Sequence, residues 1–138
     1  MSLDPFTREE RAAIMRAVKA KDTTPERAVR SAAHALGYRF RLGGRGLPGR
    51  PDLVFVARRK AIFVHGCFWH GHACKRGARA PKANAAYWQA KIARNRARDA
   101  AALSALAVLG WDALVIWECE THARTALDRR LTGFFRRK

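Results

Sequence analysis

The amino-acid sequence predicts an α/β domain with a central mixed β-sheet flanked by helices. Short apolar runs typical of buried strands alternate with longer segments of helical periodicity, and this alternation predicts strands connected by helices. The chain has 138 residues, of which 49% are hydrophobic, so it can bury a core without disulfide bonds. We therefore expect a single domain over residues 1–138, with residues 1–6 disordered or not native.

Two helices are expected before the first strand. Thr7 and Glu10 have the spacing of a capping box, which would open a helix over residues 8–20. The tripeptide Thr24-Pro25-Glu26 carries the N-cap and proline signals of a second helix, which should end near Gly37.

Three strands should follow. Residues 38–42 suit a short strand that leads into a glycine-rich basic loop over residues 43–50. Two apolar runs, 53–56 and 61–64, are separated by the polar tetrad 57–60, and this pattern predicts a β-hairpin.

The expected hairpin register places candidate site residues together at one end of the sheet. A turn centred on residues 58–59 pairs residues whose numbers sum to about 117, which would place Asp52 opposite His65 and near the carbonyl of Val64. A carboxylate and a backbone oxygen are ligands for a hard cation such as Mg²⁺. The alternative is that Asp52 is only a turn residue after a proline.

The C-terminal half should hold a long helix over residues 84–109, closed by Gly110. Residues 113–117 suit a buried strand, and a basic helix should begin near Thr121.

Residues 65–74 predict a zinc site, because they hold three of the five histidines and two of the three cysteines. The expected Cys₃His ligands are Cys67, His72, Cys74 and Cys119. His70 competes with His72 as the histidine ligand. Alternatively, the cysteines are small buried residues and the histidines are solvated. An odd cysteine count also favours a reducing cytoplasm over a disulfide framework.

Asp99 is unusual because it lies on the apolar stripe of the long helix. That stripe comprises Trp88, Ile92, Leu103 and Leu106. A carboxylate that faces a core needs a partner. Arg96 is the structural candidate, whereas His65 or His70 would be the functional one, since a carboxylate can orient an imidazole for proton transfer.

Phe68 and Trp69 lie between the expected zinc ligands. They could cap the sheet core, or they could insert between stacked bases as an aromatic wedge. Trp88 could join either group. Trp111 and Trp117 flank the last strand and are expected in the core.

A net charge of +17 predicts a polyanionic partner, and nucleic acid is favoured over a membrane. No apolar run reaches the length of a membrane span, and no secretory signal is visible. The basic residues expected around one site are Arg39, Arg41, Arg45, Arg50, Lys75, Arg76, Arg79, Lys82, Lys91, Arg94, Arg96 and Arg98.

Three segments give the chain a resemblance to a known family. They read Leu-Pro-Gly-Arg-Pro-Asp over 47–52, Phe-Val-His-Gly-Cys-Phe-Trp-His over 63–70 and Trp-Glu-Cys over 117–119. With Met15-Arg16 and residues 22–26, they make the chain similar to the very-short-patch repair (Vsr) mismatch endonucleases over nearly its whole length.

The resemblance implies a fold like that of type II restriction endonucleases, with catalytic Mg²⁺ and structural Zn²⁺. It implies an enzyme that nicks one strand of duplex DNA 5′ of the T in a T:G mismatch, the product of 5-methylcytosine deamination. It further implies a monomer acting at the nucleoid in the bacterial cytoplasm, with mismatch-repair partner proteins.

Site residues are implied in the same way. Asp52 and the carbonyl of Val64 would hold Mg²⁺, Glu26 would lie near a metal-bound water, and His70, oriented by Asp99, would activate the attacking water. His65 would contact the phosphate or that metal-bound water. The implied zinc ligands are Cys67, His72, Cys74 and Cys119, and the implied intercalating residues are Phe68, Trp69, Trp88 and Met15.

The chain departs from the family pattern at Val64, where a threonine is usual, and at Gly71 and Ala73, where histidines are usual. The main alternative function is a non-catalytic, zinc-stabilised module that binds distorted or mismatched DNA. A zinc nucleobase deaminase fits poorly, because neither His-x-Glu nor Pro-Cys-x-x-Cys is present.

Overall fold

The computed structural model describes residues 23–44, 46–67 and 85–137. Its helices and strands are α2 (Thr24–Ala35), β1 (Arg41–Leu42), β2 (Leu53–Phe55), β3 (Lys60–His65), α3 (Ala85–Val108), β4 (Asp112–Trp117) and α4 (Arg124–Arg136). Two 3₁₀ turns, η1 (Val56–Arg58) and η2 (Glu118–Thr121), complete the described elements. The helix expected over 8–20 and residues 1–6 lie outside the described residues.

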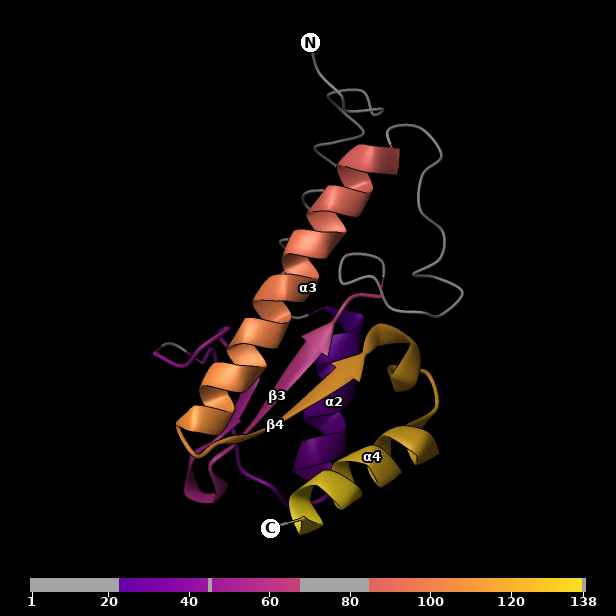
Figure 1. Cartoon of the computed structure of the whole chain (residues 1–138). Coiled ribbons are helices and arrows are strands. Elements are labelled where there is room, and N and C mark those ends of the chain that lie inside the picture. The colour runs from indigo at the N-terminus through magenta and orange to yellow at the C-terminus, as the bar shows by residue number, and fades with distance from the viewer. Residues whose placement is uncertain (1–22, 45, 68–84, 138) are drawn as a thin grey trace.

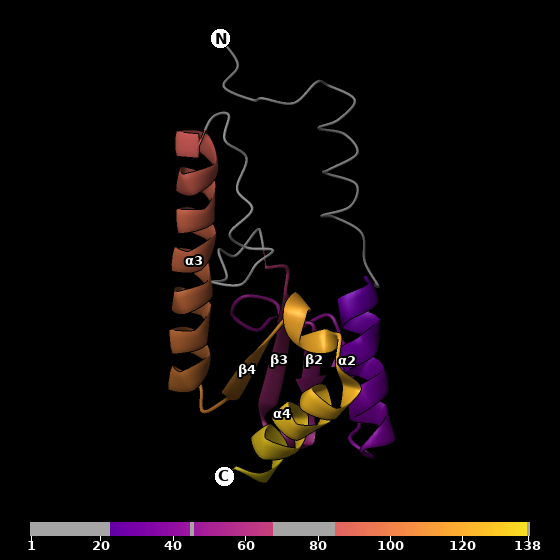
Figure 2. The same ribbon diagram turned by 90° about the vertical axis from the view of Figure 1, so that its right-hand side faces the viewer.

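The strands form one mixed sheet in the order β1-β2-β3-β4, with β1 and β2 antiparallel to their neighbours and β4 parallel to β3. Helix α3 runs along one face of the sheet, whereas α2 and α4 lie on the other (Figures 1 and 2). The predicted α/β class with a central mixed sheet is therefore confirmed.

The N-cap of helix α2 lies one residue before the expected cap. The side chain of Thr23, not Thr24, accepts a hydrogen bond from the backbone N–H of Glu26 at 3.4 Å. Pro25 occupies the first turn, where its missing N–H leaves no intrahelical hydrogen bond unmade. Gly37 follows the helix with φ of +89°, which is the left-handed conformation that ends many helices.

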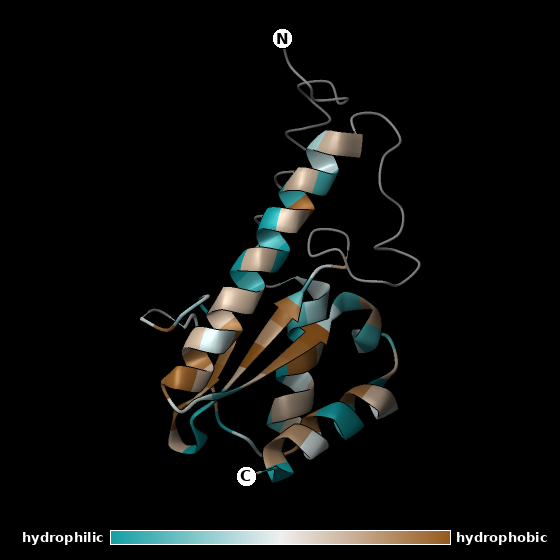
Figure 3. Cartoon of the chain, in the orientation of Figure 1, coloured by the Kyte–Doolittle hydropathy of each residue, from teal (hydrophilic) through white to brown (hydrophobic). Residues whose placement is uncertain are grey.

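The main hydrophobic core lies between the sheet and helices α2 and α4. Its buried members are Val29, Ala32, Ala33, Leu53, Phe55, Ile62, Leu114, Ile116, Leu127, Leu131, Phe134 and Phe135. In Figure 3 the strands are the most hydrophobic elements, and α3 is largely hydrophilic along its middle. Val64 packs against this core, so the alternation along β3 turns Phe63 and His65 toward α3.

The hairpin register differs from the expected one by two residues. Leu53 pairs with Ile62 and Phe55 with Lys60, so paired numbers sum to 115 rather than 117. The connection keeps four residues but lies one residue earlier, over 56–59, where η1 is followed by Arg59 in a left-handed conformation. Asp52 therefore does not lie opposite His65 in the ladder; its backbone N–H instead donates to the carbonyl of Ile62 at 2.9 Å.

Lys60 is a buried cation that joins β3 to the end of α4. Its side chain donates to Asp112 Oδ2 at 3.0 Å and to the carbonyls of Phe134 and Arg137, both at 2.9 Å. The carbonyls at a helix C-terminus have no partner within the helix, so a lysine there satisfies them and opposes the negative end of the dipole.

Two arginines of the C-terminal segment cover the outer edge of β4. Arg130 donates to the carbonyl of Val115 at 3.0 Å, and Arg137 donates to that of Ala113 at 3.2 Å. These contacts occupy edge carbonyls that another strand could otherwise pair with. In the described part of the chain, no helix has the length and apolar character that a membrane span requires.

Candidate active site

The loop before β2 places Asp52 at the end of β3. The loop is closed at its base by a hydrogen bond from the Gly44 N–H to the Pro51 carbonyl at 3.0 Å. Asp52 Oδ2 then accepts a hydrogen bond of 2.6 Å from the backbone N–H of Val64. A carboxylate bonded to a backbone donor is held in one position, as a reacting or ligating group needs to be.

Val64 faces the site with its backbone and the core with its side chain. In an extended strand the N–H and C=O of one residue point toward the same neighbour. Since the N–H of Val64 meets Asp52, its carbonyl is turned to the same side. A valine in place of threonine therefore changes the core face and leaves the site face as backbone.

His65 ends β3 on the face covered by α3. It is buried, at 7% exposure, and its Nδ1 lies 3.9 Å from Asp99 Oδ2. Its ring lies 5.3 Å from the ring of Trp117 in an edge-to-face arrangement and 5.7 Å from that of Phe63. Among the expected partners of Asp99, His65 lies within ion-pair distance in the described part of the chain.

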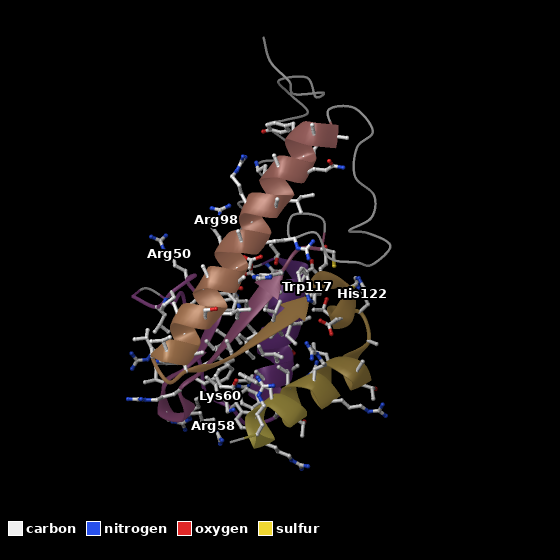
Figure 4. All side chains as sticks on the ribbon, in the orientation of Figure 1. Arg50, Arg58, Lys60, Arg98, Trp117 and His122 are labelled. Atoms are coloured by element: carbon white, nitrogen blue, oxygen red, sulfur yellow. The ribbon has the colours of Figure 1, made fainter. Side chains whose placement is uncertain are left out.

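These residues line a cavity of about 520 Å³ between the sheet end and α3. Its lining comprises Gly49, Arg50, Asp52, Phe63, Val64, His65, Asn95, Arg98, Asp99, Ala102 and Leu103. Two carboxylates, one imidazole and two guanidinium groups thus meet in one space. Arg50 and Arg98 project on the same side of α3 in Figure 4.

Asn95 is a cavity residue that the sequence reasoning did not single out. Its side chain accepts a hydrogen bond from Nη2 of Arg98. In the sequence, its role could have been inferred from its position four residues before Asp99, because residues at this spacing lie on the same face of a helix.

Two expected zinc ligands lie together at the ends of the parallel strands. His65 pairs with Trp117, so Cys67 and Cys119 each follow the pair by two residues. Cys67 is fully buried, and its Sγ accepts a hydrogen bond from the Cys119 N–H at 3.4 Å. Within residues 23–44, 46–67 and 85–137, no group of three His, Cys, Asp or Glu side chains could hold a metal ion.

Other expected site residues are not in the cavity or are not described. Glu26 lies on α2, on the opposite face of the sheet, and accepts a hydrogen bond from Arg30 at 3.2 Å. Trp88 is buried, at 5% exposure, and Lys91 lies 6.0 Å from its ring centroid. The expected residues outside the described ranges are Met15, Phe68, Trp69, His70, His72 and Cys74.

The fold and this cavity define an α/β protein with acid–base groups and arginines at one sheet end, suited to an anionic, phosphate-bearing substrate. Comparison with known proteins identifies the family. The sequence pattern of the family described as DNA mismatch endonuclease Vsr matches residues 3–76.

Relatives match over most of their lengths. The chain is 51% identical to the type II nicking enzyme V.XorIIP of Xanthomonas oryzae pv. oryzae over 128 residues, which is 93% of each chain. It is 39% identical to the DNA mismatch endonuclease Vsr of Escherichia coli over 130 residues, 94% of this chain and 83% of the relative. It is 35% identical to the type II nicking enzyme V.NmeAIP of Neisseria meningitidis over 133 residues, 96% of this chain and 94% of the relative. The chain belongs to the Vsr family of DNA endonucleases.

Proposed function

We propose that this protein nicks one strand of duplex DNA 5′ of the T in a T:G mismatch, by Mg²⁺-dependent phosphodiester hydrolysis. The observation that carries the proposal is the cavity in which Asp52, the Val64 backbone and the His65–Asp99 pair meet. Relatives named as nicking enzymes and as a mismatch endonuclease support the substrate.

The donor set beside Asp52 fits Mg²⁺. A carboxylate oxygen and a backbone carbonyl turned to the same side are hard oxygen ligands, and the open cavity leaves room for water and a phosphate. Asp52 and the Val64 carbonyl would hold the ion. When bound, Mg²⁺ supplies charge stabilisation to the phosphate as it is attacked.

Proton transfer is assigned to the imidazoles. Asp99 orients His65, and the buried setting of His65 leaves its ring a defined position from which to contact the phosphate or a water. His70 remains our proposed general base for the attacking water, and Glu26 our proposed acidic residue near the metal-bound water. The products would be a 5′-phosphate and a 3′-hydroxyl.

The convergence of Cys67 and Cys119 supports structural zinc. A backbone N–H that donates to a cysteine sulfur stabilises the thiolate form, which is the form that ligates zinc. We propose that His72 and Cys74 complete the set. The ion would tie the ends of β3 and β4 to the segment that carries Phe68 and Trp69.

We further propose that the mixed sheet, with an acidic residue beside a hairpin strand, makes the fold similar to that of type II restriction endonucleases. The proposed setting is the bacterial cytoplasm, where the protein would act as a monomer with mismatch-repair proteins. Phe68, Trp69 and Met15 are the proposed wedge residues. Trp88 would join them only by leaving its buried position.

The test is a nicking assay on end-labelled duplexes that differ by a single base, T:G against C:G, with Mg²⁺ or with chelator. We expect one nick, 5′ of the mismatched T, that depends on both the mismatch and the metal. Binding to the T:G duplex without cleavage under any divalent cation would instead favour the non-catalytic mismatch-binding module.

A further inference from the structure

The loop before β2 holds an arginine in a backbone conformation that favours glycine. Arg50 has φ of +50°, and Arg59, with φ of +52°, is the other non-glycine residue of this kind in the described ranges. Glycine or asparagine adopts this conformation with less strain. Arg50 lines the cavity whereas Arg59 does not, so the strained position of Arg50 makes it the candidate for a role at the site.

The neighbouring glycine fixes where Arg50 can reach. Gly49 lies so close to α3 and β3 that an added Cβ would be 2.6 Å from Ala102 Cβ and 3.0 Å from a ring carbon of Phe63. The backbone thus docks directly on the cavity wall. Arg50, the next residue, is held at the cavity mouth, two residues before Asp52.

Arg98 reaches the same cavity from the helix. It precedes Asp99 on α3, is exposed, and is steadied by its hydrogen bond to Asn95. A guanidinium carries five N–H donors, so this bond leaves others for a ligand. Arg98 and Arg50 extend on the same side of α3 (Figure 4).

The charges of the cavity explain why such a pair is needed. Asp52 and Asp99 present two carboxylates, and a phosphodiester that approaches them is itself anionic. Guanidinium groups stay protonated and match the oxygens of a phosphate with two parallel N–H donors. Two arginines at the mouth would offset the repulsion and fix the strand.

We propose that Arg50 and Arg98 form a clamp that binds a backbone phosphate of the strand being cut, next to the scissile phosphodiester. The inference rests on the proposed function, since it names a substrate contact of the same cavity. Arg50 is the principal arm, because the docked loop fixes its backbone, whereas Arg98 depends on side-chain contacts.

The chain provides a matched control for Arg50. Arg50→Gly and Arg59→Gly each remove one positive charge and each put glycine at a positive φ, so both should fold at least as stably as the wild type. Arg59 precedes β3, at the opposite end of that strand from the site. The variants would be compared in single-turnover nicking of a T:G duplex and in equilibrium binding of that duplex across salt concentrations with chelator present.

We expect Arg50→Gly to lower kcat/KM by about 10- to 100-fold, since hydrogen bonds to a charged group are lost. The slope of log K against log salt should fall by about one, as for one phosphate contact. Arg59→Gly should stay within about twofold of the wild type. Arg50→Lys should keep the salt slope but not the rate, because lysine cannot bind in bidentate fashion.

For the second arm, Arg98→Ala should lose activity, whereas Arg129→Ala, on the outer surface of α4, should not. Equal nicking by Arg50→Gly and Arg59→Gly, or an unchanged salt slope in Arg50→Gly, would overturn the clamp. If the wild type binds the duplex but never nicks it, the proposed function is wrong. The two salt slopes would still decide whether Arg50 binds a phosphate.

Discussion

Replacement of Gly49 by alanine should force the loop before β2 away from α3 and β3, against which it packs. The new methyl group would lie 2.6 Å from Ala102 Cβ and 3.0 Å from the Phe63 ring, distances at which atoms overlap. The backbone also has φ of +75°, which disfavours alanine. Either the loop stays docked and is strained, or it moves away and takes Arg50 and Asp52 with it.

The expected loss of folding stability follows from the steric overlap and the unfavourable backbone conformation. A left-handed conformation costs alanine about 1–2 kcal/mol, and overpacking by one methyl group costs about 1–3 kcal/mol. A docked loop would therefore lose about 2–5 kcal/mol of stability. If the loop instead moves away from α3, the steric overlap is relieved and the loss of stability is smaller than this. The site residues on the loop are then displaced, so we expect a large loss of nicking activity.

A double-mutant cycle with Ala102→Gly measures the contact itself. Removal of the Ala102 methyl opens space on α3, at a cost of about 1 kcal/mol for glycine in a helix. We expect Gly49→Ala and Ala102→Gly to couple favourably by about 1 kcal/mol or more in urea unfolding, and the double variant to nick faster than Gly49→Ala alone. Additive stabilities, or a fully active Gly49→Ala protein, would refute the docking.

Three further predictions concern stability, zinc and catalysis. The Arg137 hydrogen bond is the main cause that lowers the pKa of Asp112 from 3.8 to about 2. A depressed pKa stabilises the fold above pH 3.8 and ceases to do so as the pH falls to about 2. Asp112→Asn should lower the free energy of unfolding by about 1 kcal/mol at neutral pH, a value reduced for solvent screening because a third of the Asp112 side chain is exposed. In unfolding measured across pH, the stabilities of the variant and the wild type should converge near pH 2. Cys119→Ser should release zinc and lower the melting temperature; unchanged metal content by mass spectrometry would remove the proposed ligand set. Asp99→Asn should slow single-turnover nicking by about 100-fold with little change in DNA binding, whereas an equal loss of binding would make Asp99 a structural residue rather than an orienting one.

Local signals predicted the elements well. The proline and threonine at the start of α2, the glycine after α3 and the apolar runs of β2, β3 and β4 all act over a few residues, and each element was found within a few residues of its expected position. The stripe on α3 likewise predicted that Asp99 would face inward, and it does line the cavity.

Contacts between residues far apart in the sequence could not be predicted from local patterns. Lys60 reads as a turn residue in sequence, yet it is buried because its partners, Asp112 and the end of α4, lie more than fifty residues away. Strand β3 begins at Lys60, one residue before the expected strand, and the hairpin register differs from the expected one by two. Asp52 consequently reaches Val64 through its side chain rather than facing His65 across the ladder.

Asp52 is the residue to which we assign the chemical step of DNA cleavage. The decisive comparison is between the wild type and Asp52→Asn, an isosteric change that keeps a side-chain oxygen for the Val64 N–H and removes the charge that would hold Mg²⁺. We predict that Asp52→Asn binds the T:G duplex as the wild type does in fluorescence anisotropy, yet nicks it more than about 10³-fold more slowly in single turnover. If Asp52→Asn nicks the mismatch at the wild-type rate, Asp52 has no part in the chemical step.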